Sequence, residues 1–155
     1  MLLMNPPRCG VIAVTTPRPW DAGAGPDIVL DPLGPCRILV VEDEAMVAML
    51  VEDQLLAAGA EVLGPAASLA TALALLDRAE GCDAAVLDVN LRGESVVPLA
   101  DALARRGVPF LFMTGYGDTD GLGAHAAVPV LAKPFDPLEL VMVLARLLQR
   151  AKAAG

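Results

Sequence analysis

The sequence predicts an α/β domain built on a parallel β-sheet. From residue 37 onward, short apolar runs alternate with longer segments of helical periodicity. Polar or charged side chains follow the apolar runs, and glycine follows several of the helical segments. Because each parallel crossover passes over one face of a sheet, this alternation predicts helices on both faces.

Five apolar runs are the strand candidates, and they cover residues 37–41, 61–63, 84–87, 109–113 and 129–131. A doubly wound (βα)5 sheet of five parallel strands commonly has the flavodoxin-like order 2-1-3-4-5. In that order the first and third strands are neighbours at the switch point, where open α/β sheets bind their ligands.

Four clear helical segments lie between or after these strands, at 44–58, 68–79, 95–106 and 137–152. Gly59, Gly81 and Gly107 follow the first three, where glycine readily takes the left-handed conformation that ends a helix. Ser68 and Asp136 have side chains suited to N-capping. These signals predict where the helices begin and end.

A fifth helical segment, 118–126, is weak. The surrounding chain contains Gly117, Gly121 and Gly123, and each glycine costs about 1 kcal/mol relative to alanine in a helix interior. We therefore expect this helix to be short, irregular or mobile.

The chain of 155 residues has the length of one domain. We expect a Pro/Gly-rich extension at 1–35, the domain at 36–152 and a tail at 153–155. The extension is either disordered, draped over the domain, or an inert leader. The last helix is apolar over a wide face, so a partner protein, a second copy of the chain or the apolar patch at 11–14 is expected to cover it.

Composition excludes several classes of function. The net charge of -8 opposes binding to nucleic acid. The longest uncharged apolar stretch, 62–76, is shorter than the roughly 20 residues that span a membrane. Cys9, Cys36 and Cys82 show no metal-ligand spacing, which favours reduced thiols over disulfides or zinc. We expect a cytoplasmic protein.

Charged and polar residues stand at four strand ends. Glu42 and Asp43 follow the first strand, Asp88 the third, Thr114 the fourth and Lys133 the fifth. Paired acids after a strand can simply favour the N-terminus of the next helix. Here, however, all five residues fall at carboxyl ends, which share one edge of a parallel sheet.

Converging carboxylates repel one another unless a cation neutralises them. Mg²⁺ prefers oxygen ligands, so we expect Glu42, Asp43 and Asp88 to hold it, with the main-chain carbonyl of Asn90 as a further ligand. Lys133 would balance the remaining charge. A phosphoryl group on Asp88 would then be surrounded by the metal, the Lys133 ammonium and the Thr114 hydroxyl.

Four sequence blocks, at 41–44, 87–90, 114–116 and 133–135, resemble the signature blocks of the response-regulator receiver domain of two-component signalling. The resemblance covers about 37–152. It implies a switch in which Asp88 accepts a phosphoryl group from a sensor histidine kinase with Mg²⁺ bound. It also implies that Thr114 moves onto the phosphoryl group, that Lys133 pairs with it, and that the Lys133–Pro134 peptide bond is cis.

The stretch 109–116 further resembles a subgroup of single-domain receivers with a Phe-x-x-Thr-Gly-Tyr signature. One position departs from the receiver pattern, since Val130 stands where an aromatic switch residue is usual, three residues before Lys133. Two roles stay open for Tyr116: it takes over the aromatic switch, or it only covers the sheet edge.

The expected function is a stand-alone phosphoryl-accepting switch without an attached output domain, and not a turning-over enzyme. Its partners are the kinase and either a downstream protein or a second copy bound through the last helix. A phosphatase or phosphotransferase would need a second acid near the nucleophile, where Asn90 stands, and a cap insertion. A phosphorylation-independent module would typically have lost an acid or the lysine, and the sequence retains all of them.

Overall fold

A computed structural model describes residues 31–115 and 122–154. Within these ranges five strands form one sheet, and its order β2-β1-β3-β6-β7 confirms the predicted order 2-1-3-4-5. All neighbouring strands of the sheet are parallel. The strands are β1 (Arg37–Val41), β2 (Glu61–Ala66), β3 (Ala84–Asp88), β6 (Phe110–Thr114) and β7 (Val130–Ala132).

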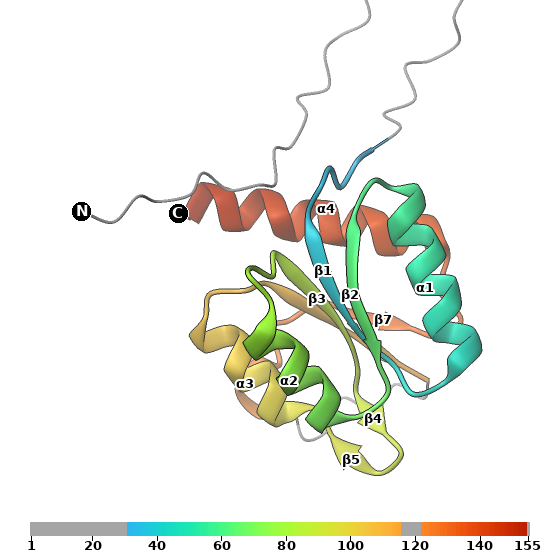
Figure 1. Ribbon diagram of the computed structural model, residues 1–155, viewed down its shortest axis with the longest axis vertical. Coiled ribbons are helices and arrows are strands. Elements are labelled where there is room, and N and C mark those ends of the chain that lie inside the picture. Colours follow the sequence, from blue (N-terminus) through green and yellow to red (C-terminus); the bar gives the residue numbers. More distant parts are fainter. Residues whose placement is uncertain (1–30, 116–121, 155) are drawn as a thin grey trace, which may run out of the picture.

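Four α-helices cover the two faces of this sheet (Figure 1). They are α1 (Ala45–Ala57), α2 (Leu69–Arg78), α3 (Val97–Arg105) and α4 (Pro137–Ala154). Helices α1 and α4 share one apolar core with the sheet, and α2 and α3 share the other. The fold is therefore the doubly wound α/β architecture that the alternation of strands and helices predicts.

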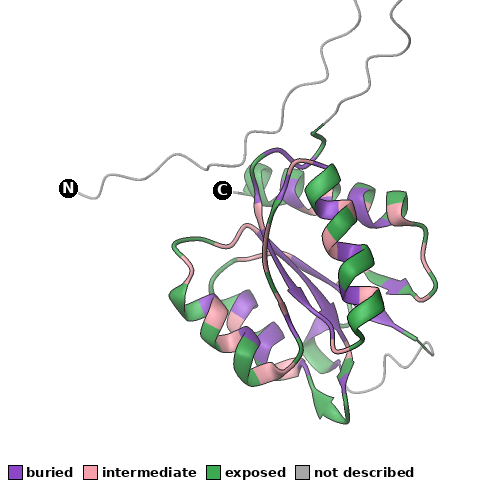
Figure 2. Cartoon of the chain, turned by 45° about the vertical axis from the view of Figure 1, so that its right-hand side comes forward, coloured by how far each residue is buried: buried purple, intermediate pink, exposed green. Residues whose placement is uncertain are grey.

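Alternate residues of the interior strand β1 pack into the two cores. Ile38 and Val40 of β1 pack on the α1 and α4 side, while Leu39 and Val41 pack on the α2 and α3 side. All four are fully buried, because side chains alternate between the faces of a strand and both faces are covered. Figure 2 shows this continuous buried interior along the strands.

The predicted helix ends are largely confirmed. Gly59 and Gly107 follow α1 and α3 with φ of 89° and 69°, in the left-handed region. The Ser68 side chain accepts a hydrogen bond from the Thr71 N–H at the start of α2, and the Asp136 carboxylate accepts one from the Leu138 N–H. Gly81 does not end α2, because the helix already stops at Arg78 and Ala79 is extended.

The weak segment after β6 forms only a 3-10 turn, η1 (Gly123–His125), within the described part of the chain. His125 is buried, and its Nε2 lies 2.7 Å from Asp101 Oδ1 of α3. Its ring also meets the ring of Phe110 edge to face, with centroids 5.5 Å apart. These contacts attach η1 to the α3 side of the sheet.

A small antiparallel hairpin, β4 (Asn90–Leu91) and β5 (Glu94–Ser95), follows β3 and was not predicted. Its two-residue turn consists of Arg92 and Gly93, with φ of 53° and 85°. Asn-Gly or Asp-Gly is the usual sequence signal for such a turn, and this chain has arginine instead. The helix expected from residue 95 begins accordingly later, at Val97.

The described chain joins the core before β1. Leu33 is buried, and its N–H donates to the Ala58 carbonyl at the end of α1.

Cys36 is disulfide-bonded and Cys82 is a free thiol, so the expectation of only reduced thiols is wrong for Cys36. The spacing of cysteines in the sequence does not indicate which sulfur atoms meet in space. None of the helices in the described residues has the length and apolarity that a membrane-spanning segment needs.

Candidate functional site

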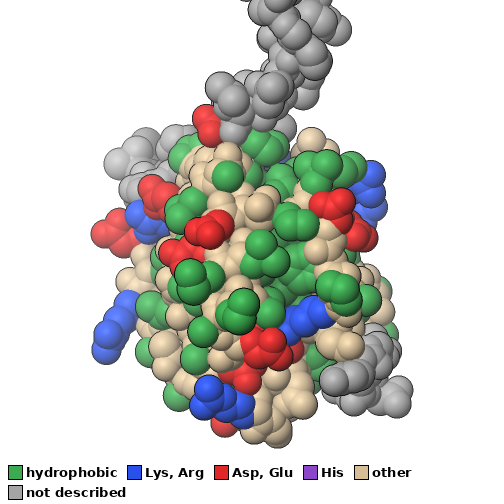
Figure 3. Space-filling model, turned by 90° about the vertical axis from the view of Figure 1, so that its right-hand side faces the viewer, with side chains coloured by type: hydrophobic (Ala, Val, Ile, Leu, Met, Phe, Trp, Pro, Cys, Tyr) green, Lys and Arg blue, Asp and Glu red, His purple; other side chains and the backbone are tan. Residues whose placement is uncertain are grey.

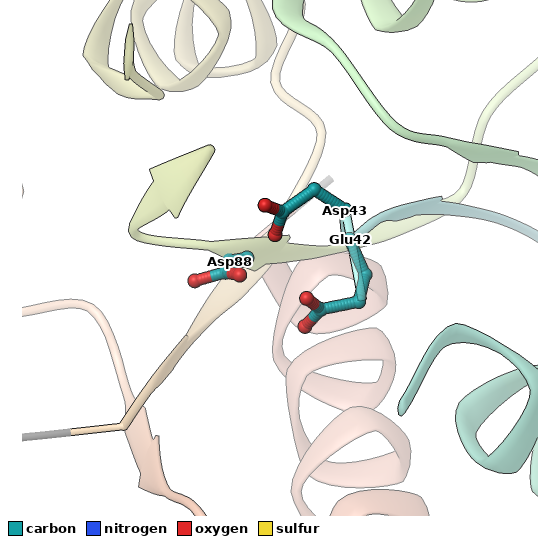
Figure 4. A group of neighbouring side chains, drawn as sticks. All are labelled: Glu42, Asp43 and Asp88. Carbon is teal, nitrogen blue, oxygen red and sulfur yellow. The ribbon is translucent and has the colours of Figure 1, made fainter. Parts of the chain in front are cut away.

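Three carboxylates meet where β1 and β3 end. Glu42 and Asp43 directly follow β1, and Asp88 is the last residue of β3, the strand beside it. One oxygen from each carboxylate lies within 4.8 Å of the others, and Figure 4 shows the three side chains gathered at these strand ends. The sheet thus brings together residues that are 45 positions apart in sequence.

Lys133 completes the cluster from the end of β7. Its Nζ donates to Glu42 Oε2 at 2.7 Å and lies 3.3 Å from Asp88 Oδ2. The Lys133–Pro134 peptide bond is cis, as the family resemblance implies. The amine therefore bridges the carboxylates of two different strands.

Burial sets the protonation of this cluster. Glu42 is 2% exposed, and loss of hydration raises the pKa of its carboxyl to about 7, a shift that the Lys133 hydrogen bond reduces and the nearby Asp88 increases. Burial acts to lower the pKa of Lys133, but its bonds to Glu42 and the negative charge of both carboxylates raise it overall. Lys133 therefore stays a cation beside the carboxylates.

The β1–β2 pairing positions Glu42. The register shifts between Leu39 and Val41, and the Glu42 N–H then donates to the Ala66 carbonyl at 2.9 Å. On the partner strand β2, the irregular residue is Gly64, whose φ is 97°. A local bulge in β2 thus holds the main chain of the first acidic residue.

The hairpin adds two groups to the site. The Asn90 N–H donates to Asp88 Oδ1 at 3.2 Å, and Arg92 Nε lies 3.6 Å from Asp43 Oδ2. We did not predict Arg92 from the sequence. A two-residue turn directly after the third strand would have indicated it. Such turns are usually recognised by Asn-Gly or Asp-Gly, and this chain has Arg-Gly.

The structure describes some of the remaining predicted site residues and not others. Thr114 is buried at the end of β6, and its carbonyl accepts from the Lys133 N–H at 2.8 Å. Val130 is partly exposed on β7, the edge strand. Tyr116 lies outside the described residues. So does the patch at 11–14.

The donor set suits a hard divalent cation. Three carboxylate oxygens within 4.8 Å of one another match the oxygen preference of Mg²⁺, which binds through a few carboxylates and keeps several waters. Beside this cluster lies a cleft of about 370 Å³. Its lining consists of Glu44, Val47 and Leu50 from the start of α1, together with Gly115, Lys133, Pro134 and Phe135.

Comparisons with known proteins identify the family of the chain. The family model described as the response regulator receiver domain matches residues 38–145. The uncharacterized transcriptional regulatory protein YbdJ of Bacillus subtilis (strain 168) is 28% identical over 117 residues, which are 73% of this chain and 51% of YbdJ.

Two solved structures are also similar. SdrG from Sphingomonas melonis Fr1 is 42% identical, with a TM-score of 0.61, over 74% of this chain and 97% of that chain. The response regulator PhyR from Brucella abortus is 27% identical, with a TM-score of 0.67, over 77% of this chain and 50% of that chain. The chain thus spans about half the length of YbdJ and of the PhyR chain.

Part of the subgroup resemblance does not hold. Leu111 stands three residues before Thr114, while the phenylalanines stand two and four residues before it. The Phe-x-x-Thr-Gly-Tyr spacing is therefore not met.

Proposed function

Because the chain belongs to the response regulator receiver domain family, we propose that it is a stand-alone receiver that accepts a phosphoryl group from a sensor histidine kinase onto Asp88. The reaction depends on Mg²⁺ and switches a protein–protein interaction surface. The single-domain part of the proposal is supported by the match to SdrG, which covers 97% of that chain. A cytoplasmic location is part of the same proposal.

The observation that carries the proposal is the position of Asp88 between an amine and two further carboxylates. In the transfer, an Asp88 oxygen attacks the phosphorus of a phosphohistidine, and a P–O bond forms as the P–N bond breaks. The electron pair of the broken bond remains on the imidazole nitrogen. The Lys133 ammonium, 3.3 Å from Asp88 Oδ2, pairs with a phosphoryl oxygen and stabilises the developing charge.

Glu42, Asp43, Asp88 and the main-chain carbonyl of Asn90 would hold the metal. When bound, Mg²⁺ neutralises negative charge on the carboxylates and on the phosphoryl oxygens. The Thr114 hydroxyl then moves onto the phosphoryl group, and Tyr116, two residues further on, either follows it or covers the sheet edge. The receiver fold is a signalling switch, and the only chemistry we propose for it is its own phosphorylation and dephosphorylation.

The kinase is proposed to approach over α1. Met46, Met49, Leu50 and Leu56 are exposed large apolar side chains on this helix, and Figure 3 shows hydrophobic side chains among acidic ones over this face. Leu50 also lines the cleft that reaches Lys133. An apolar helix of the kinase seated here would place its phosphohistidine at the carboxyl ends of the strands.

Replacing the acceptor tests the proposal. The wild-type protein, incubated with acetyl phosphate and Mg²⁺, should gain one phosphoryl group by intact-protein mass spectrometry. Asp88→Asn should gain none, because its amide cannot form the acyl phosphate. Asp53→Asn makes the same chemical change at an exposed position of α1 and should be labelled like the wild type. Labelling of Asp88→Asn would disprove the assignment.

A further inference from the structure

We propose that Arg92 is a tethered counter-ion of Asp43, with which a divalent cation must compete, so that Arg92 sets the metal affinity of the site. The inference rests on the proposed function, because it concerns metal binding by the same carboxylates. It assigns a role to a residue of the hairpin that follows the acceptor strand.

The first observation is how positive charge is distributed over the acidic cluster. Lys133 contacts Glu42 and Asp88. For Asp43, the ion pair that the structure shows within the described residues is the one with Arg92, at 3.6 Å between Nε and Oδ2. The Asp43 side chain is only 14% exposed. Arg92 therefore neutralises the one carboxylate of the cluster that the lysine does not contact.

The second observation is the backbone that carries Arg92. Its φ of 53° is in the left-handed region, where residues other than glycine, asparagine and aspartate are disfavoured. The hairpin holds it there: the Gly93 N–H donates to Asn90 Oδ1 at 2.7 Å, and Leu91 is buried. Asn90 in turn donates to Asp88, so the turn fixes the base of the Arg92 side chain next to the site.

The pair is suited to being displaced. The Arg92 side chain is 79% exposed, and ion pairs with an exposed member are weak and screened by salt. A divalent cation on Asp43 would nevertheless repel the guanidinium a few ångströms away. Removing the charge of Arg92 should therefore strengthen metal binding by a factor of about two to five.

Three variants separate charge from structure. Arg92→Gln removes the charge and retains a polar stem, Arg92→Asn removes it with a residue that the turn favours, and Arg92→Lys keeps it. Arg150→Gln changes the net charge equally at an exposed site near the end of α4. Mg²⁺ dissociation constants are measured on the full chain by NMR titration of backbone amides, at low and at high salt.

Arg92→Gln and Arg92→Asn should both bind Mg²⁺ about two- to fivefold more tightly at low salt, with a smaller gain at high salt. Arg92→Lys and Arg150→Gln should match the wild type. Unchanged or weaker binding in both uncharged variants would overturn the inference. If Asp43→Asn still weakens Mg²⁺ binding in that case, the proposed metal site remains and only the role of Arg92 is rejected. If the wild type binds no Mg²⁺, or Asp43→Asn leaves its affinity unchanged, the inference and the proposed metal site fail together.

Discussion

Among the single side chains, Glu42 has the most unusual environment. It is 2% exposed, accepts hydrogen bonds from Lys133 and from the Glu44 N–H, and has a pKa raised to about 7, chiefly by burial. Because the folded-state pKa lies above the ordinary value of 4.5, the folded protein binds a proton at Glu42 more tightly than the unfolded chain. This stabilises the fold below pH 4.5 and the effect is lost as the pH rises through about 7.

We predict that Glu42→Gln removes this pH dependence. In the metal-free protein, the free energy of unfolding of the wild type should fall by on the order of 2–3 kcal/mol relative to Glu42→Gln between about pH 4.5 and about pH 8. Urea denaturation in the presence of a chelator measures it. Glu139→Gln, at an exposed position of α4, serves as the control. Parallel pH profiles for wild type and Glu42→Gln would show that Glu42 titrates normally.

Among the secondary structure elements, β2 shows how strand irregularity serves the site. Gly64 has a φ of 97°, and a Cβ added there would lie 2.7 Å from the Ala66 nitrogen and 2.9 Å from the Val40 carbonyl oxygen. Both neighbours are backbone atoms, which cannot rotate away. Since Ala66 accepts from the Glu42 N–H, the bulge connects the edge strand to the acidic pair.

We predict that Gly64→Ala lowers the free energy of unfolding by more than about 2 kcal/mol, because it adds both a backbone clash and a disfavoured φ. Gly81→Ala is the matched control, since a Cβ there would meet nothing within 4 Å and its φ is not in the left-handed region. It should change stability by less than about 1 kcal/mol. Urea denaturation of the two variants compares them, and equal losses would contradict the role of the bulge.

Across the domain, exposed large apolar side chains lie on α1, on β7 and on α4. Of the exposed apolar residues of α1, Leu50 lines the cleft. A second surface is defined by the exposed side chains of Val130, on the edge strand β7, and of Leu138 and Met142 on α4. Thr114 links the site to this second surface, because β6 pairs directly with β7. We propose that this surface, with the segment after β6, carries the output of the switch.

We predict that beryllofluoride with Mg²⁺, which mimics the phosphoryl group, changes amide chemical shifts and hydrogen exchange mainly at residues 114–132 and along α4. In the sequence, glycines at 117, 121 and 123 each disfavour a helix, so we expect this segment to follow Thr114. Asp88→Asn provides the control without the acceptor. Changes confined to α1 and α2, with 114–132 silent, would mean that the output surface lies on the other side of the domain.

Much of this could be predicted because the relevant signals are local. The burial of Ile38, Val40 and their alternating neighbours follows from an apolar run with charged residues after it. The caps at Ser68 and Asp136 and the glycines after α1 and α3 were predicted from the preferences of single residues. The set of Glu42, Asp43, Asp88, Thr114 and Lys133 was predicted because parallel strands share one carboxyl edge, and the structure places all five there.

The misses occurred where the preference of a single residue type was overridden in the folded chain. The hairpin of β4 and β5 keeps Arg92 at a positive φ that its residue type disfavours, and α2 ends before Gly81 although glycine is available. The disulfide at Cys36 likewise depends on which groups meet in the folded chain.

Hydrophobic periodicity and the residues at strand ends thus specified the parallel sheet and the residues gathered at its edge, and the strand order followed from the arrangement that such five-stranded sheets commonly adopt. Distances, burial and pairing had to come from the packed domain. Only packing buries Glu42 enough to raise its pKa. Packing also places the Lys133 amine next to the carboxylates of Glu42 and Asp88, and pairs Asp43 with Arg92. Desolvation and charge pairing depend on neighbours that are remote in the chain, so they exist only once the domain has folded.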